Sequence, residues 1–360
     1  MIVAFLLAVA AAQSQPAHTP LQAQATQARL AGRLDEAVTA YKRALVATPA
    51  WSEGWYFLGT IYYEKDRPKD CVDAFARFTK LQPNVSAGHA FLGLCLFQLG
   101  QYPASLAELN RAERIGLPQE DALTDVASYH AAMLHTKDGN FEKALQILNF
   151  FSRRETIDPK IIELTGITAL RRAIFPADLQ ASDRELIYRT GRAVMTGGAR
   201  RAAEAARMFE ELTQDFPTER NLHFVYGSLL LGSDPEAAMR QFQQELKIQP
   251  DHLPTHVVMG LQYLSQGQFE AARSTGEIAI KLAPRNFTAY TVLGRALAEG
   301  GLDIPAGIAS LEKAVELEPG SPQVRIALAA AYAKAGRRDE AAKQRAEFQR
   351  LKKALEGGAP

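Results

Sequence analysis

Small side chains recur along this 360-residue chain at a spacing close to 34 residues, and this period limits the fold more than any other feature. The first column of small residues comprises Ala25, Gly59, Gly93, Ala132, Ala193, Gly227, Gly260, Gly294 and Ala329. About twelve positions after each of these stands a second small residue, such as Ala37 or Ala144. Two helices approach closely only where both present small side chains. The period therefore predicts an all-α solenoid of stacked antiparallel helix pairs.

Turn-forming residues recur with the same period. Glycines stand between the two helices of most units, where a left-handed residue ends the first helix: Gly32, Gly100, Gly139, Gly267, Gly301 and Gly336. Prolines stand where second helices end, because proline disfavours helix in the residue before it: Pro49, Pro83, Pro217, Pro250, Pro284 and Pro319.

One unit shows the full pattern of a known repeat. Its key residues are Trp55, Leu58, Gly59, Tyr62, Cys71, Phe75, Phe78 and Pro83. With this pattern recurring in about nine units over residues 18–353, the chain resembles the tetratricopeptide repeat (TPR) family. The resemblance implies a TPR superhelix that is right-handed and whose concave face is lined by first helices.

The pattern divides the chain into six segments. They are a signal peptide at 1–12, a flexible lead-in at 13–17, an N-terminal TPR block of about four repeats at 18–159, an irregular helix and joint at 160–185, a C-terminal TPR block of about five repeats at 186–353 and a tail at 354–360. Arg345 replaces the aromatic residue of other units, which predicts a polar outer face where the solenoid ends.

The joint interrupts the repeats. Lys160 to Ile174 reads as one helix without a regular partner, Phe175 to Asp178 stops it, and Ser182 or Asp183 caps the next helix. Two interpretations stay open for this segment: a hinge between rigid blocks, or a loop insertion with no mechanical role.

The N-terminus contains a predicted targeting sequence. Residues Ile2 to Ala12 form an apolar run that is too short to span a bilayer but suits a secretory signal peptide, although no Lys or Arg precedes it. Export to the periplasm or the exterior is therefore expected, with no transmembrane span in the mature chain. The absence of a basic residue fits either a misplaced start codon or a weak signal, and if the signal is spurious the protein is cytoplasmic.

Composition and motifs argue against several classes of chemistry. With 41 Lys and Arg against 40 Asp and Glu, the chain has no excess of basic charge for nucleic-acid binding. It contains no phosphate-binding loop, serine-hydrolase elbow or zinc-protease motif. His252 and His256 are four apart, but Pro254 lies between them and no third ligand is adjacent. No metal, cofactor or catalytic residue is expected.

The two cysteines fall on neighbouring predicted helices. Cys71 lies in the second helix of one unit and Cys95 in the first helix of the next. A disulfide forms only if the two Cα atoms lie within about 7 Å of each other. A disulfide and a pair of buried thiols both fit the sequence.

The resemblance also implies which side chains line the concave groove. Its first-helix positions correspond here to Tyr56, Thr60, Tyr63, Ala90, Leu94, Phe97, Tyr129, Met133, Phe224, Leu231, Val257, Leu261 and Leu264. The set is mainly apolar with aromatic members, which is typical of a groove for a peptide or helix segment of a partner protein. The alternative is that many of these side chains pack between neighbouring first helices.

Three functions follow in order of preference. The first is an exported, non-enzymatic scaffold that assembles or tethers cell-envelope proteins. The second is a cytoplasmic TPR adaptor. The third is an enzyme or ligand sensor at the joint, which requires a pocket with convergent polar groups from Arg171, Arg172, Asp178, Asp183 and Arg184.

Overall fold

A computed structural model describes residues 19–118 and 121–356. Within these ranges the chain forms 19 α-helices and two 3-10 turns, and no strand, so the expected all-α fold is confirmed. The helices are α1 (Pro20–Leu30), α2 (Leu34–Ala47), α3 (Ser52–Glu64), α4 (Pro68–Leu81), α5 (Ser86–Gln98), α6 (Tyr102–Ile115), α7 (Ala122–Lys137), α8 (Phe141–Arg153), α9 (Pro159–Ala169), α10 (Arg184–Gly198), α11 (Ala202–Asp215), α12 (Leu222–Leu230), α13 (Pro235–Ile248), α14 (Leu253–Ser265), α15 (Phe269–Leu282), α16 (Phe287–Glu299), α17 (Ile304–Leu317), α18 (Pro322–Lys334) and α19 (Arg338–Glu356). The 3-10 turns are η1 (Pro176–Asp178) and η2 (Ala181–Asp183).

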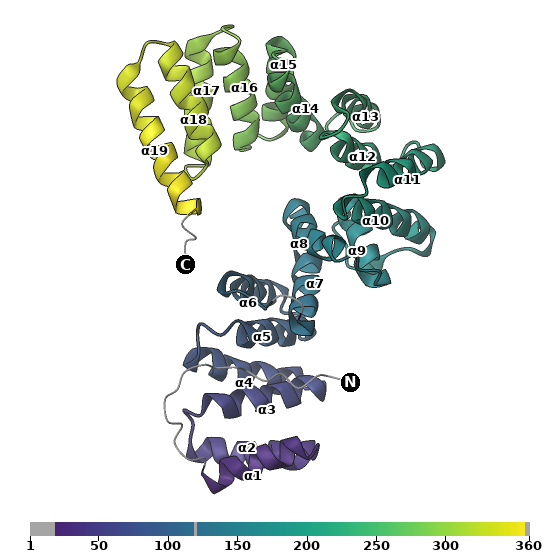
Figure 1. Ribbon diagram of the computed structural model, residues 1–360, viewed down its shortest axis with the longest axis vertical. Coiled ribbons are helices and arrows are strands. Elements are labelled where there is room, and N and C mark those ends of the chain that lie inside the picture. The colour runs from purple at the N-terminus through teal and green to yellow at the C-terminus, as the bar shows by residue number, and fades with distance from the viewer. Residues whose placement is uncertain (1–18, 119–120, 357–360) are drawn as a thin grey trace. The chain divides into compact units, whose positions relative to one another are not determined.

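Consecutive helices pack in pairs. For example, α3 packs against α4, α5 against α6 and α16 against α17 (Figure 1). The chain divides into two compact units, with the division in sequence between Leu134 and His135, inside α7. The segment 160–185, expected to separate two blocks, lies within the second unit.

Small residues of the first column allow the close approach of the two helices in a pair. A Cβ atom added to Gly59 would lie 2.6 Å from the Phe75 ring, and one added to Gly93 would lie 2.7 Å from Leu109. Gly227 meets Phe242 in the same way. The large residue sixteen positions or so after each glycine therefore fills the space that the missing side chain leaves.

The turn glycines have the backbone conformation that the sequence predicts. All six between-helix glycines named above have φ between 69° and 77°. At the corresponding positions of two other units stand Asp66 and Arg200, with φ of 51° and 64°. These two units form the same turn with a side chain that the left-handed region disfavours.

In several units the side chain at the position of Trp55 donates a hydrogen bond, a role that the sequence does not reveal. The Trp55 Nε1–H donates to the Pro49 carbonyl oxygen (2.8 Å), and the His256 Nε2–H donates to that of Pro250 (2.8 Å). Arg325 donates to Pro319 at 3.2 Å. His89 and His223 make the corresponding bonds at 3.0 and 3.3 Å. These donors pair with carbonyls beyond the end of the preceding second helix, which the helix itself leaves unpaired.

The irregular segment differs in detail from the sequence-based expectation. The helix expected over 160–174 ends at Ala169, because Arg171 adopts a left-handed conformation and the Arg172 amide bonds back to the Ile167 carbonyl. Two 3-10 turns then replace the second helix of a regular pair. Asp183 is the first residue before α10, but its side chain makes no capping hydrogen bond.

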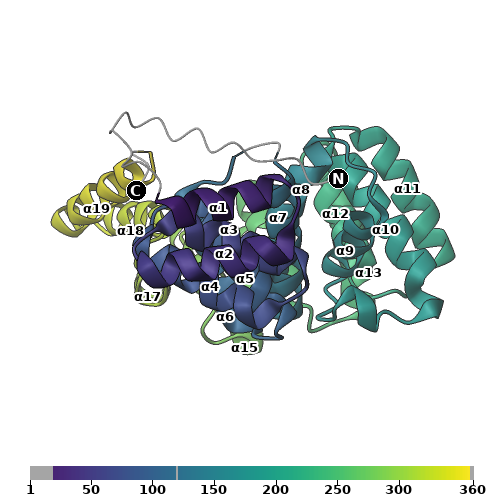
Figure 2. The ribbon, with the colours of Figure 1, turned by 90° about the horizontal axis from the view of Figure 1, so that it is seen from below.

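Without a regular second helix, α9 packs directly on α10. Figure 2 shows α9 beside α10, and α12 packs in turn against α10 and α13. Buried residues from this region, including Ile167, Leu170, Ile187 and Phe209, form one hydrophobic cluster. The joint is thus part of a packed core.

Candidate functional site

Five of the thirteen proposed groove residues are buried. Their exposed fractions are 7% for Tyr56, 0% for Ala90, 2% for Leu94, 7% for Met133 and 5% for Leu264. Burial raises the pKa of the Tyr56 hydroxyl to about 12. These side chains pack inside the stack, as the alternative interpretation of the groove proposes, and a partner cannot reach them without a rearrangement.

In the first unit, partly exposed aromatic side chains remain on α3, α5 and α7. Tyr63 makes an edge contact with Phe91, with 5.5 Å between the ring centroids. Phe97 lies against Tyr102 and His130, at 5.3 and 4.7 Å. Burial lowers the pKa of the His130 ring, which favours its neutral form in this cluster.

The two other partly exposed groove residues of this unit are Thr60 and Tyr129. Thr60 donates its hydroxyl hydrogen to the Phe57 carbonyl, and Tyr129 makes an edge contact with His130. Thr60, Tyr63, Phe97 and Tyr129 are thus the partly exposed groove positions of α3, α5 and α7, and we call them the aromatic surface of the first unit.

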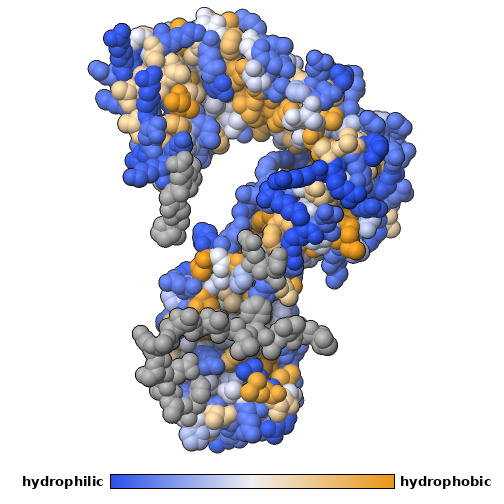
Figure 3. Space-filling view, viewed as in Figure 1, coloured by the Kyte–Doolittle hydropathy of each residue, from blue (hydrophilic) through white to orange (hydrophobic). Residues whose placement is uncertain are grey.

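In the second unit, an apolar surface follows α12 and α14. Phe224, Leu231 and Val257 are half-buried, and Leu261 is 39% exposed. The Phe224 ring is held by Phe242 and by an edge contact with the His252 ring. Hydrophobic residues gather around α14 and α16 (Figure 3).

One exposed apolar residue on a later first helix is not among the predicted groove residues. Ile326 on α18 is 41% exposed and follows Arg325, just as Val257 follows His256 one residue after the Trp55 position. Extending the groove positions to α16 and α18 would have found it. We call Phe224, Leu231, Val257, Leu261 and Ile326 the first-helix apolar surface.

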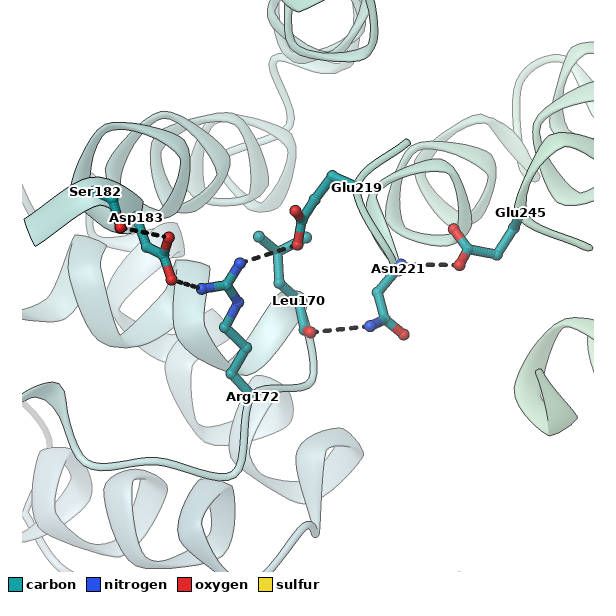
Figure 4. A network of polar contacts seen from close by, with 7 residues as sticks. All are labelled: Leu170, Arg172, Ser182, Asp183, Glu219, Asn221 and Glu245. Carbon is teal, nitrogen blue, oxygen red and sulfur yellow. Dashed lines mark hydrogen bonds and ion pairs between the residues drawn. The ribbon is translucent and has the colours of Figure 1, made fainter. Parts of the chain in front are cut away.

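The charged residues at the joint pair with one another. The Arg172 guanidinium contacts the carboxylates of Asp183 and Glu219 (Figure 4). Arg171 pairs with Glu142 at 2.6 Å and Arg184 with Glu163 at 3.3 Å. Asp178 accepts a hydrogen bond from the Phe175 amide. Each of the five residues named for a ligand site therefore makes a structural contact, and Arg172 and Asp183 share one.

A buried carboxylate on α13 orders the start of the preceding helix, α12. Glu245 on α13 is fully buried, and its Oε1 accepts the Asn221 amide hydrogen at 2.8 Å (Figure 4). Its Oε2 accepts the Phe224 amide hydrogen at 3.2 Å. The Asn221 side chain donates to the Leu170 carbonyl at 3.0 Å. Glu245 thus satisfies amide groups at the start of α12, and the Asn221 side chain ties that helix to the end of α9.

A cavity of about 360 Å³ lies beside the joint, between α8, α9 and α10. Its lining mixes apolar and polar side chains and includes Leu145, Gln146, Asn149, Thr165 and Val194. Glu142 also borders it. Burial opposes ionisation of this carboxyl, but the hydrogen bond from Arg171 prevails and lowers its pKa. The guanidinium that pairs with Glu142 does not itself line the cavity.

Metal-binding groups do not cluster within the described ranges. No set of three or more His, Cys, Asp and Glu side chains there has the geometry to hold an ion. The His252 Nδ1 pairs with Thr255, and the His256 Nε2 pairs with Pro250. Both rings therefore belong to the packing of α14.

The two cysteines meet inside the first unit. Cys71 on α4 and Cys95 on α5 form a disulfide in the structure, and their Cα atoms are 6.0 Å apart. Both residues are fully buried.

None of the helices described combines the length and apolar character needed to cross a bilayer. The predicted signal peptide at 1–12 and most of the tail at 354–360 lie outside the described residues.

Comparison with known families gives two matches. The family model described as "T7SS, ESX-1 secretion system protein EccA1, N-terminal domain" matches residues 5–184, half of the chain. A tetratricopeptide repeat model matches residues 257–303, which include most of α14 and all of α15 and α16. No curated protein matches the sequence.

Solved structures of MamA resemble parts of the chain. A MamA RS-1 ArsTM double mutant is 22% identical, with 49% of this chain and 98% of that chain covered and a TM-score of 0.44. A MamA fragment from residue 41 onward, from Desulfovibrio magneticus RS-1, is 22% identical over 47% of this chain and 96% of that chain, with a TM-score of 0.43.

Proposed function

Because the chain belongs to the family of the N-terminal domain of the ESX-1 secretion system protein EccA1, we propose that it is a protein-binding adaptor of an ESX-type secretion system. The match over residues 5–184 is the observation that carries this proposal. The stacked helix pairs support it, since solenoids of this kind present an extended surface for other proteins. The family favours the adaptor interpretation over a scaffold that assembles or tethers envelope proteins.

The first-helix apolar surface is the proposed contact region in the second unit. Leu261 and Ile326 are the most exposed of its members, at 39% and 41%. Large apolar side chains at such positions gain free energy when a partner removes them from water, by about 25 cal/mol for each Å² buried. We propose that a helix or an extended segment of a partner protein lies along these helices. Tyr63 and Phe97 would serve the same purpose in the first unit.

We also propose that the chain acts without chemistry of its own. The joint supports this view because its charged groups are used in pairs, such as Arg172 with Asp183 and Arg171 with Glu142. An adaptor needs only a stable surface and a way to be localised next to its partner proteins.

Charged substitutions on first helices of the second unit, with a control on a second helix, test the contact region. We expect Leu261→Asp and Ile326→Asp to weaken co-purification of secretion-system proteins with the tagged full-length chain. Leu282→Asp on α15 is the matched control, because Leu282 is also 39% exposed but lies on a second helix. Equal loss in all three variants, or no loss in any, would remove this surface as the contact region.

The proposed compartment is the cytoplasm. The family model aligns from residue 5, so most of the apolar run at 2–12 is matched as part of the domain. N-terminal sequencing of the protein from fractionated cells tests this point. An intact N-terminus in the cytoplasmic fraction is expected, whereas cleavage after Ala12 with recovery outside the cytoplasm would restore the export interpretation.

A further inference from the structure

The whole chain contains only two cysteines, and the fold brings them together. They are 24 positions apart in sequence and lie on successive helices, α4 and α5. Both have an exposed fraction of 0%. Two buried thiols in contact are the arrangement from which a disulfide forms without movement of the backbone.

The bond crosses the interface between two helix pairs. Cys71 belongs to the second helix of the α3–α4 pair, and Cys95 belongs to the first helix of the α5–α6 pair. Around them, Leu58, Phe75, Leu92 and Leu96 form a continuous hydrophobic cluster. The contact therefore joins two repeats whose other contacts are mainly apolar.

Neither position requires sulfur for packing. Position 71 belongs to the second column of small residues, where other units have Ala37, Ala144, Ala205, Ala272 and Ala341. Position 95 corresponds to Ala296 on α16 and Ala331 on α18. Alanine fills both positions elsewhere in the same chain, so the pair supplies something that packing alone does not.

We propose that Cys71 and Cys95 form a redox-controlled clip between the second and third helix pairs. The oxidant is a low-molecular-weight disulfide such as glutathione disulfide. The two cysteine thiols lose two protons and two electrons and form one S–S bond, while the S–S bond of the small disulfide is reduced to two thiols. In a reducing compartment the pair stands as two thiols, and oxidising conditions close the clip.

Closing the clip stabilises the part of the molecule that carries the aromatic surface of the first unit. Cys95 lies two residues before Phe97 on α5, and α4 pairs with α3, which carries Tyr63. A cross-link limits the freedom of the unfolded chain and so raises the free energy of unfolding. The redox state therefore sets how readily α4 and α5 separate, and with it the stability of that surface.

Full-length protein treated with glutathione disulfide or with dithiothreitol tests the clip. After each treatment, free thiols are alkylated under denaturing conditions and counted by intact mass. We expect no alkylated thiol after oxidation and two after reduction. We expect the oxidised protein to melt about 5–10 °C above the reduced protein.

The variant Cys71→Ala/Cys95→Ala is the control, because alanine occupies both positions in other units. Its melting temperature should be the same after both treatments. Two titratable thiols after glutathione disulfide treatment, or a mixed disulfide with glutathione that persists at the end of the reaction, would overturn the proposal. So would equal melting temperatures of oxidised and reduced wild-type protein, a comparison that does not depend on the variant.

Discussion

Gly166 on α9 and Gly191 on α10 bring two helix backbones into direct contact. A Cβ atom on Gly166 would lie 1.9 Å from the Ile187 carbonyl oxygen, and one on Gly191 would lie 1.9 Å from that of Ile162. The contact is reciprocal, and the obstructing atoms belong to the backbone. The two glycines therefore set the distance between α9 and α10 where a regular second helix is absent.

Alanine at either glycine should destabilise the second unit. Because a backbone carbonyl cannot rotate away as a side chain does, we expect Gly166→Ala and Gly191→Ala each to lower the free energy of unfolding by about 3 kcal/mol or more. Gly232→Ala is the control, since nothing lies within 4 Å of a Cβ there. Urea denaturation measures all three, and a change below about 0.5 kcal/mol in the first two would contradict the close contact.

Replacing Arg200 in its turn by glycine should stabilise the protein. Arg200 has a φ of 64°, where other units have glycine. Arg200→Gly should raise the free energy of unfolding by about 0.5–1 kcal/mol, because glycine adopts this conformation without a steric penalty. The reverse change, Gly336→Arg, should lower it by a similar amount. Thermal denaturation of both variants checks the sign, and a loss in Arg200→Gly would refute the argument.

The hydrogen bond from Trp55 to the Pro49 carbonyl should contribute measurably to the free energy of unfolding. Trp55→Phe removes the donor and part of the ring, so we expect a loss of about 1–2 kcal/mol in unfolding free energy. Tyr290 occupies the corresponding position on α16, and no hydrogen bond joins it to Pro284, both of which lie in the described range. Tyr290→Phe should accordingly be nearly neutral. Chemical denaturation in which both variants lose the same amount would argue against the bond.

Acid should weaken the second unit through His252. Burial lowers the pKa of this ring to about 4; the nearby Glu245 and Asp251 carboxylates oppose this shift, whereas Arg171 and His256 add to it. The unfolded chain, with an ordinary pKa of about 6.5, binds the proton more readily. Stability should therefore fall as the pH drops from about 6.5 to about 4, by up to about 3 kcal/mol, and this contribution should change little below that range.

A variant without the titrating ring isolates this effect. His252→Phe keeps an aromatic ring beside Phe224 and removes the ionisable group. Unfolding free energies measured between pH 7 and pH 4 should fall less steeply in the variant than in the wild type. Parallel pH profiles would show that His252 does not carry the acid sensitivity.

Residues that act through the backbone were the most predictable part of this fold. The column of Gly59 holds only glycine or alanine, and the turn position of Gly100 holds glycine in most units, so their period alone predicts the helix pairs and where they turn. The exposure of the groove side chains was less predictable. Tyr56 and Leu94 follow the family positions, yet they are buried. The Tyr56 ring packs against Phe75 and Phe78 on α4 and against Phe91 on α5, and such contacts between helix pairs are not encoded in the period.

The packing at the joint was likewise only partly predictable from the sequence. The sequence indicates that a regular partner helix is missing after α9, but nothing local to Gly166 shows that α10 closes the gap from 25 residues further along. The donor role of His256 was also hidden, because its acceptor, the Pro250 carbonyl, is a backbone atom that the periodic pattern does not encode.

Photocrosslinking from the first-helix apolar surface tests the adaptor function most directly. A photoreactive amino acid is placed at position 261 of the full-length chain in cells, and at position 282 as the equally exposed control. Mass spectrometry then identifies the adducts. A secretion-system protein crosslinked from position 261 and absent from position 282 is the predicted result. Adducts that are the same from both positions, or none from position 261, would contradict the account.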